Sequence, residues 1–424
     1  MFKRSMYNLE FSSKGKKYIY NSLSGELVGI NDGIIAFLDE ITNNSNPANY
    51  IYYQQLRDKG FIVNAELDEF SRYIALKNEQ LYSRNSASVS YVIALTTNCN
   101  YKCVYCYENG CNVGNMTDLT ANQLVDFIIS ECDSNLLLKR INITWFGGEP
   151  LLAIDKITLI GDKVLSYSDS RGIIFQTNII TNGYYLNEAN LELLKKYNLV
   201  QVQITLDGEK ELYNAYKQPN ATDAFETVLD NIRTISKSTN VDLRLNCSHR
   251  NYYSLKELCK KIIADEECSI DRIKFSLSKL NMEGFDEEIS IPDFSKYKLD
   301  FISFLSEMGL KSNVKSYLPK PRTIPCGLMK RSNFVIDHNG YLYKCEHFVG
   351  QKKYSVGNVV DGLLYPVFQH DFEDKGFDKR CTNCSIFPIC RGGCSQKRFI
   401  GSSSIECKSK MEETKQIILK IIGG

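Results

Sequence analysis

Short apolar runs and longer amphipathic segments alternate through the middle of the chain. The apolar runs are rich in β-branched residues and predict strands over 89–95, 142–146, 173–181, 199–206, 242–246 and 272–277. Between them, apolar residues at three- and four-residue spacing predict helices, for example over 121–132, 187–197, 224–236 and 254–263. Because this alternation is typical of repeated βα units, we predict an α/β fold with a parallel sheet.

The first 83 residues follow another pattern. A Ser24-Gly25 turn between two apolar runs predicts a β-hairpin over 17–30, and Asp32 is a candidate cap of the next helix. The other elements predicted here are helices over 32–40, 50–59 and 68–83, a strand over 61–63 and a polar linker over 84–90. We therefore expect a small N-terminal domain and a linking helix.

Charge and hydropathy exclude two classes of protein. The 51 Lys and Arg residues balance 50 Asp and Glu residues, so we expect no basic surface for nucleic acid. No apolar run approaches the ~20 residues that a membrane span needs, and the N-terminus lacks a signal-peptide pattern. The amphipathic segment 411–422 is expected to dock on the protein itself. We expect a cytoplasmic protein with no nucleic-acid or membrane partner.

The chain has 15 cysteines, and their clustering indicates metal chemistry. Cys99, Cys103 and Cys106 follow the predicted strand 89–95, on a loop with turn-forming asparagines. Three thiolates this close together can hold a four-iron cluster and leave its fourth iron open for a ligand. Core cysteines without a ligand role and a zinc site are the alternatives, although zinc usually takes four ligands in a closed structural site.

A second group of cysteines lies in the C-terminal third. Four of its members have the spacing C-x2-C-x5-C-x3-C and three others lie upstream or downstream; the group is Cys381, Cys384, Cys390 and Cys394 with Cys326, Cys345 and Cys407. A zinc ribbon is the alternative, but seven ligands match neither one zinc site nor two. The remaining cysteines are interpreted as ordinary core or surface thiols, namely Cys111, Cys132, Cys247, Cys259 and Cys268.

The C-x3-C-x2-C motif, with Tyr105 before its last cysteine, resembles the signature of the radical S-adenosylmethionine (SAM) superfamily. A second motif of that family is matched where the predicted strand 142–146 ends in Gly147-Gly148-Glu149-Pro150. The resemblance implies a partial (β/α)6 barrel in which the open iron of a 4Fe–4S cluster binds SAM. It also implies that Tyr105 and the Gly-Gly-Glu-Pro turn belong to the cofactor site. Glycine suits such a turn because it lacks a Cβ and lets a ligand approach the backbone.

Two further segments carry the resemblance. Thr205-Leu206-Asp207-Gly208 resembles the Ser-Leu-Asp-Gly segment of SAM enzymes that act on peptides, and Asn246 matches a position that helps to bind SAM. We therefore place Thr205, Asp207 and Asn246 in the predicted cofactor site, with an ordinary turn as the alternative for the first segment. The family's His-Asp-x-x-Arg motif is not kept, because its positions are Tyr213, Asn214 and Lys217 here.

The C-terminal cysteines resemble the SPASM extension of radical SAM enzymes that modify peptides and proteins. The resemblance implies two auxiliary 4Fe–4S clusters, one on Cys326, Cys345 and Cys394 and the other on Cys381, Cys384, Cys390 and Cys407. Some relatives have an eighth cysteine where this chain has Ser332. The first auxiliary cluster is therefore expected to keep an open iron that can bind a substrate thiolate.

Glu346 directly follows Cys345, at a place where some relatives carry an acidic proton acceptor. We name it as a candidate catalytic residue, with a solvated surface acid as the alternative.

The N-terminal pattern resembles the winged-helix domain that recognises leader peptides in ribosomal-peptide maturases; a small packing subdomain is the alternative. In such domains the leader adds a strand to the edge of the sheet. The expected domains are 1–83 for peptide recognition and the linking helix, 84–290 for the barrel, 291–325 for a bridging region and 326–424 for the SPASM domain.

Together these features predict a radical SAM peptide maturase that uses SAM and three 4Fe–4S clusters to form cysteine thioether cross-links, as in sactipeptide or ranthipeptide maturation. The expected partners are a ribosomally made precursor peptide and a flavodoxin or ferredoxin-type electron donor. Carbon–carbon cross-linking of a peptide and formylglycine formation on a sulfatase are the alternative enzymatic activities. An iron–sulfur electron carrier or a zinc-binding interaction module is the non-enzymatic alternative.

Overall fold

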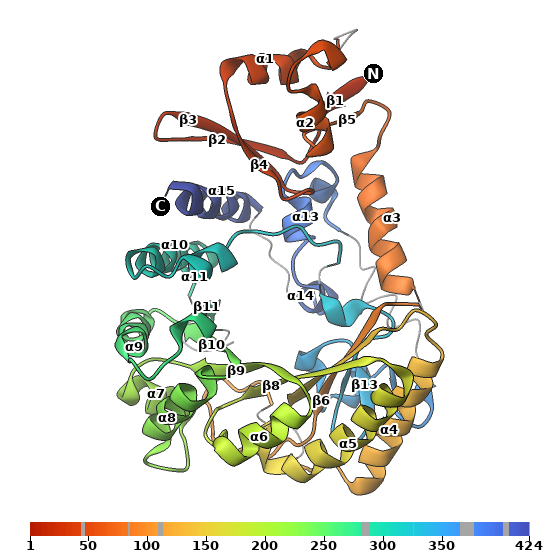
Figure 1. Ribbon diagram of the computed structural model, residues 1–424, viewed down its shortest axis with the longest axis vertical. Coiled ribbons are helices and arrows are strands. Elements are labelled where there is room, and N and C mark those ends of the chain that lie inside the picture. The colour runs from red at the N-terminus through yellow and green to blue at the C-terminus, as the bar shows by residue number, and fades with distance from the viewer. Residues whose placement is uncertain are drawn as a thin grey trace. The chain divides into compact units, whose positions relative to one another are not determined.

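The computed structural model describes residues 1–43, 47–83, 85–108, 113–280, 289–324, 326–364, 377–401 and 407–423 (Figure 1). The chain forms two compact units. The first contains the described parts of 1–83, 305–330 and 371–424, and the second those of 84–304 and 331–370. The domain boundaries expected at 83, 290 and 325 stay predictions, because compactness alone does not define a domain.

The second unit is built on a mixed sheet with the strand order β11-β10-β9-β8-β7-β6-β12-β13-β14-β15 among the described residues. Strands β6 to β11 pair in parallel, β12 pairs in parallel with β6, and the last strands pair antiparallel. The strands are β6 (Ser88–Ala94), β7 (Arg140–Phe146), β8 (Ile174–Thr181), β9 (Leu199–Leu206), β10 (Asn240–Cys247), β11 (Ile273–Lys279), β12 (Phe334–Ile336), β13 (Tyr341–Tyr343), β14 (Gly357–Asn358) and β15 (Gly362–Leu363).

Helices connect the parallel strands and lie along one face of the curved sheet (Figure 1). They are α4 (Asp118–Asp133), α5 (Ile154–Arg171), α6 (Glu188–Lys196), α7 (Lys210–Lys217), α8 (Ala224–Ser236) and α9 (Tyr252–Ala264). Helix α10 (Ile291–Glu307) follows β11, and its residues from 305 onward belong to the first unit. The βα alternation predicted from the sequence is confirmed, and so is the α/β class.

The alternation of side chains along β9 shows that one face of this sheet packs a hydrophobic core and the other lines a polar pocket. Val202, Ile204 and Leu206 are buried. Gln203 and Thr205, one position out of phase, line a pocket on the other face. Because successive side chains of a strand point to opposite faces, the apolar set packs the core and the polar set forms the pocket wall.

The first unit combines the N-terminal residues with the C-terminal cysteine region. Its strands and helices are β1 (Phe2–Arg4), β2 (Asn8–Ser13), β3 (Lys16–Asn21), β4 (Leu27–Ile30), α1 (Asp32–Glu40), α2 (Tyr53–Asp58), β5 (Ile62–Asn64), α3 (Glu69–Tyr82), α11 (Lys311–Ser316), α13 (Phe387–Cys390), α14 (Ser395–Phe399) and α15 (Cys407–Gly423). Strands β2, β3 and β4 form one antiparallel sheet, and β1 pairs with β5.

Apolar side chains join the N-terminal sheet to the cysteine region within this unit. Leu9 and Tyr20 pack with Ile386, Ile389 and Ile418, and all five are buried. The hydroxyl of Tyr20 also donates to the carbonyl oxygen of Pro319 at 2.7 Å. Segments far apart in the sequence therefore share one hydrophobic core.

The sequence predictions for this unit were correct in outline and wrong in detail. The hairpin over 17–30 and the helix over 32–40 are confirmed. The cap of that helix is Asn31 rather than Asp32, since the Asn31 side chain accepts from the Ile34 amide. Strands β1 and β2 were missed. The linker predicted over 84–90 is also too long, because Ser88 already pairs with Arg140 in β6.

The amphipathic segment 411–422 lies in α15, and Ile418 joins the core described above, so the predicted docking role is confirmed. Among the described residues, no helix is both long and apolar enough to cross a bilayer.

Leu9→Ala is expected to destabilise the first unit. Leu9 is 4% exposed, so the truncation leaves a cavity beside Ile386 and Ile389 and lowers the free energy of unfolding by about 2–5 kcal/mol. Leu76→Ala is the matched control, because Leu76 on α3 is 43% exposed and its loss is expected to change little. Anaerobic urea unfolding of both variants makes the comparison, and equal stabilities would contradict it.

Candidate active site

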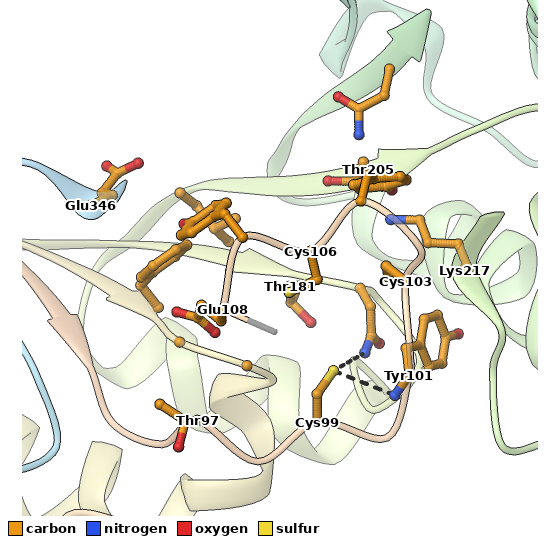
Figure 2. A pocket seen from close by; sticks show the side chains of 18 of the residues that line it. Thr97, Cys99, Tyr101, Cys103, Cys106, Glu108, Thr181, Thr205, Lys217 and Glu346 are labelled. Atoms are coloured by element: carbon orange, nitrogen blue, oxygen red, sulfur yellow. Dashed lines mark hydrogen bonds between the residues drawn. The ribbon is translucent and has the colours of Figure 1, made fainter. Parts of the chain in front are cut away.

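A pocket of about 570 Å³ lies at the carboxyl ends of the parallel strands of the second unit. Figure 2 shows Cys99, Cys103 and Cys106 around it. The strands β8 to β11 contribute polar side chains to its wall, namely Thr181, Gln203, Thr205, Arg244, Asn246 and Lys279. Ligands bind at this end of parallel sheets because the loops that follow the strands converge there.

Backbone hydrogen bonds fix the cysteine loop to α7. The amides of Lys102 and Val104 donate to the carbonyl oxygens of Lys217 and Tyr216 at 3.2 and 2.9 Å. Cys99 Sγ accepts from the Tyr101 amide at 3.4 Å. Protein contacts therefore hold the loop in a defined shape.

Tyr213 takes part in the same attachment. Its hydroxyl lies 2.8 Å from the hydroxyl of Tyr101, and both tyrosines are buried. Tyr213 occupies the first position of the motif that the sequence does not keep, so this segment contacts the cysteine loop through different side chains.

The two glycines of the Gly-Gly-Glu-Pro turn make room for the cysteine loop. A Cβ on Gly147 would lie 2.2 Å from the Thr96 carbonyl oxygen, and one on Gly148 would lie 2.3 Å from that of Asn98. Gly147 also has a φ of +122°, a backbone angle that side chains disfavour. The amides of Gly148 and Glu149 donate to the Thr96 and Asn98 carbonyl oxygens at 2.9 Å each. The glycines are therefore required by a backbone–backbone contact, in addition to the ligand approach expected from the sequence.

Glu149 is completely buried and connects this turn to the end of β8. Its carboxylate accepts from the Thr181 hydroxyl at 2.8 Å, the Asn182 amide at 2.9 Å and the Leu151 amide at 3.1 Å. Pro150 begins the short 3₁₀ helix that Glu149 caps. The carboxylate lies behind the pocket wall, which makes Glu149 a positioning residue here; its direct contact with SAM stays a prediction.

Burial raises the pKa of Glu149 from 4.5 to about 7, against the opposing effect of its hydrogen bonds. Between these two values the folded protein binds more protons than the unfolded chain. The free energy of unfolding is therefore expected to fall by up to roughly 3 kcal/mol as the pH rises from about 4.5 to 7.

Glu149→Gln removes this titration and is expected to flatten the dependence of stability on pH, as measured by anaerobic urea unfolding at several pH values. Glu226→Gln, at an exposed acid on α8, is the control and should keep the wild-type slope. A wild-type slope in Glu149→Gln would contradict the assignment.

Tyr105, Asp207 and Lys217 form a buried polar group beside the cysteines. The Tyr105 hydroxyl donates to Asp207 Oδ2 at 2.5 Å. Lys217 Nζ lies 3.5 Å from the same oxygen and 5.6 Å from the centre of the Tyr105 ring. The side chains of Lys217 and Asp207 are 4% and 1% exposed. Burial and the Asp207 charge raise the pKa of Tyr105 well above its usual value, so Tyr105 stays a hydrogen-bond donor.

Asp207→Asn is expected to cost about 3–5 kcal/mol of unfolding free energy, because it leaves the Lys217 ammonium buried without its counter-charge. Asp162→Asn is the matched control: Asp162 pairs with Lys196, both are about half exposed, and the loss should stay under about 1 kcal/mol. Chemical denaturation measures both. Equal losses of unfolding free energy would show that the buried pair contributes no more to stability than the exposed pair.

The other residues predicted for the cofactor site are placed as follows. Thr205 and Asn246 line the pocket, whereas Asp207 acts through Tyr105 and Lys217. Asn246 Oδ1 accepts from Arg244 Nε at 3.2 Å. The sequence analysis did not select Arg244; it alternates with apolar residues on β10, a pattern that could have identified it as inward-facing.

Glu346 lies on the opposite side of the pocket from Lys217 (Figure 2). Burial raises its pKa, and Arg244 opposes this effect. Cys345, a predicted auxiliary ligand, directly precedes the lining residue Glu346 in the chain. A second carboxylate that the sequence analysis missed, Glu108, also lines the pocket, and burial raises its pKa to about 7.

The three thiols of the loop are candidate ligands of one cluster. No three His, Cys, Asp or Glu side chains of the described residues converge closely enough to hold one metal ion. The thiols instead share a pocket, as ligands of separate irons do. Burial raises the pKa of Cys99 to about 12 and also raises that of Cys103. A metal would therefore have to displace protons from these sulfurs.

The C-terminal cysteines are divided between the two units. Cys345 belongs to the second unit, and the other predicted ligands belong to the first: Cys326, Cys381, Cys384, Cys390, Cys394 and Cys407. Cys390 and Cys394 flank a tight turn, and burial raises the pKa of Cys381 to about 11. The two auxiliary ligand sets stay predictions.

The cysteines interpreted as ordinary thiols are also placed. Cys132, Cys247 and Cys259 are buried, Cys268 is partly exposed, and Cys111 lies outside the described residues.

Comparison with known proteins gives three findings. Residues 93–249 match the radical SAM superfamily. A cysteine-type anaerobic sulfatase-maturating enzyme of Clostridium novyi (strain NT) is 25% identical over 336 residues, which cover 72% of this chain and 86% of the relative. A serine-type anaerobic sulfatase-maturating enzyme of Bacteroides thetaiotaomicron is 22% identical over 354 residues, which cover 71% and 81% of the two chains.

Solved structures share the fold. The native anSMEcpe structure with bound AdoMet has a TM-score of 0.63 and 19% identity, covering 79% of this chain and 98% of that one. Streptococcus suis SuiB bound to its precursor peptide SuiA has a TM-score of 0.54 and 14% identity, covering 93% of this chain and 95% of that one. The expected radical SAM fold is confirmed by these likenesses and by the parallel sheet.

Proposed function

As the chain is a SAM-dependent enzyme with a radical SAM domain at residues 93–249, we propose that it matures a ribosomally made precursor peptide by forming cysteine thioether cross-links. The observation that carries this proposal is the position of Glu346, which lines the pocket of Cys99, Cys103 and Cys106 and directly follows Cys345. A substrate thiol held near Cys345 would thus lie beside a carboxylate and close to the SAM site.

Cys99, Cys103 and Cys106 would hold the cluster that binds SAM, and the C-terminal cysteines would hold two auxiliary clusters; together these groups would supply one-electron chemistry. Forming a C–S bond from a C–H and an S–H removes one hydrogen atom, one proton and one electron. The group derived from SAM would take up the hydrogen atom, and an auxiliary cluster would take up the electron. Glu346 accepts the thiol proton, since it is the carboxylate next to Cys345.

The other residues of the site bind and position. Thr205 and Asn246 would form the SAM side of the pocket together with Gly147 and Gly148, which also line it. Tyr105, Asp207 and Lys217 hold the cysteine loop against α7. A flavodoxin or ferredoxin-type protein of the reducing cytoplasm is the proposed electron donor.

A groove in the first unit supports recognition of a leader peptide. It measures about 600 Å³ and is lined by β3, β4 and the helices α1 and α2. Strand β4 is the edge of its sheet in the described part of the chain, so its backbone can pair with an added strand. SuiB, whose likeness covers 93% of this chain, was solved with its precursor peptide, which favours this proposal over a packing role.

Formylglycine formation on a sulfatase is the second candidate, because sulfatase-maturating enzymes are relatives at 22–25% identity. The peptide product distinguishes the candidates.

The test is mass spectrometry of a candidate precursor peptide after reaction with anaerobically reconstituted, reduced enzyme and SAM. We expect a loss of about 2 Da per link and one fewer alkylatable cysteine. An aldehyde that reacts with a hydrazide probe would instead indicate formylglycine, and a loss of about 2 Da with all cysteines still alkylatable would indicate a carbon–carbon link.

Glu346→Gln is the companion variant. It is expected to retain SAM cleavage and to lose at least about tenfold in the rate of link formation, since it removes the proton acceptor. Glu346→Asp should recover part of this rate. Wild-type linking by Glu346→Gln would remove Glu346 from the mechanism.

A further inference from the structure

Two arginines contribute to the turn that joins Cys390 to Cys394 in the first unit. Arg391 lies within the turn with a φ of +54°, and Arg398 reaches back to it from α14. Under the proposed function Cys390 and Cys394 belong to different auxiliary clusters. Both arginines therefore belong to or contact a turn whose two ends would ligate different clusters.

Arg398 closes the turn but leaves one of its donors unused. Its Nη1 donates to the carbonyl oxygens of Gly392 and Gly393 at 2.8 and 2.9 Å, and its Nη2 donates to Ser395 Oγ at 3.2 Å. Its Cζ lies 5.3 Å from the centre of the Phe377 ring. Its Nε is buried and has no acceptor among the described residues.

Arg391 shows the same incomplete pairing. Its Nη1 donates to the Ile324 carbonyl oxygen at 3.2 Å, while its Nε is buried without an acceptor among the described residues. Burying a donor without a partner costs free energy, and the cost is higher when the donor is charged. Two such donors at one turn indicate acceptors that this protein acquires on binding a ligand.

The surroundings of both arginines identify the kind of acceptor. Cys394, Cys381 and Cys390 act electrostatically on Arg398, and Cys390 and Cys326 act on Arg391. Arg391 directly follows Cys390, and the carbonyl oxygens that Arg398 binds belong to Gly392 and Gly393, between Cys390 and Cys394. Both Nε–H groups therefore lie among predicted cysteine ligands. A cluster held by these cysteines would supply anionic sulfur as the acceptor.

We propose that Arg391 and Arg398 are redox-tuning residues, each donating its Nε–H to a sulfur of an auxiliary cluster. Hydrogen bonds to cluster sulfurs and nearby positive charge favour the reduced, more negative cluster and so raise its reduction potential. This would prepare the auxiliary clusters to accept the electron released when a link forms. The inference rests on the proposed assignment of the C-terminal cysteines to two clusters.

The experiment is an anaerobic redox titration of the reconstituted full-length protein, followed by electron paramagnetic resonance, for wild type, Arg391→Met and Arg398→Met. Each substitution is expected to favour the oxidised auxiliary cluster at least tenfold, which corresponds to a midpoint lower by about 59 mV for a one-electron couple. The signal of the SAM-binding cluster should keep its midpoint.

Lys397→Met is the matched control, because it removes one positive charge from the same helix at an exposed position. Its auxiliary midpoints should equal those of wild type. Unchanged midpoints in both arginine variants at full iron content, or an equal shift in Lys397→Met, would overturn the inference.

Iron content separates failure of the inference from failure of the proposed function. Wild type is expected to hold about twelve irons, and about four would remove the auxiliary clusters and the inference with them. If Arg398→Met loses iron, Arg398→Lys decides, because it keeps the charge and can still reach the turn carbonyls. A lowered midpoint in Arg398→Lys supports donation by Nε–H, and a wild-type midpoint overturns it.

Discussion

The candidate active site depends on backbone hydrogen bonds that hold the cysteine loop between two neighbours. On one side, the amides of Gly148 and Glu149 bond the carbonyl oxygens of Thr96 and Asn98. On the other, the amides of Lys102 and Val104 bond the end of α7. The side chains of Cys99, Cys103 and Cys106 line the pocket instead of packing in a core, so backbone hydrogen bonds must hold the loop in shape. The two glycines allow this contact, because a Cβ at either position would collide with the loop.

Buried ionisable groups are the second feature of the site, and each of them has partners that stabilise it. Glu149 is stabilised by three donors from two segments, so it joins β7 to β8 at the pocket wall. Lys217 and Asp207 compensate each other beside Tyr105. Burying such groups costs free energy that a purely apolar wall would not. In return, these groups fix the arrangement of donors and charges around the thiols.

In the first unit, packing between distant segments of the chain fixes the structure. Residues from both ends of the chain share one core, in which Tyr20 and Ile418 pack together with Ile386. The turn from Cys390 to Cys394 is closed by Arg398 rather than by regular secondary structure. The N-terminal sheet and the C-terminal cysteine region are thus parts of one packed unit, and a change in either is expected to affect the stability of the other.

The sequence by itself determined the α/β class, the positions of the parallel strands and the three-cysteine loop, because side-chain period and ligand spacing are local properties. Its resemblance to a known family identified Glu346 and the Gly-Gly-Glu-Pro turn as candidates. Only the tertiary structure placed Arg244 and Glu108 in the pocket, paired Lys217 with Asp207 and brought Arg398 to the cysteine turn. These roles arise from contacts between residues distant in the chain or around a turn, and no periodic pattern records which buried charge meets which partner.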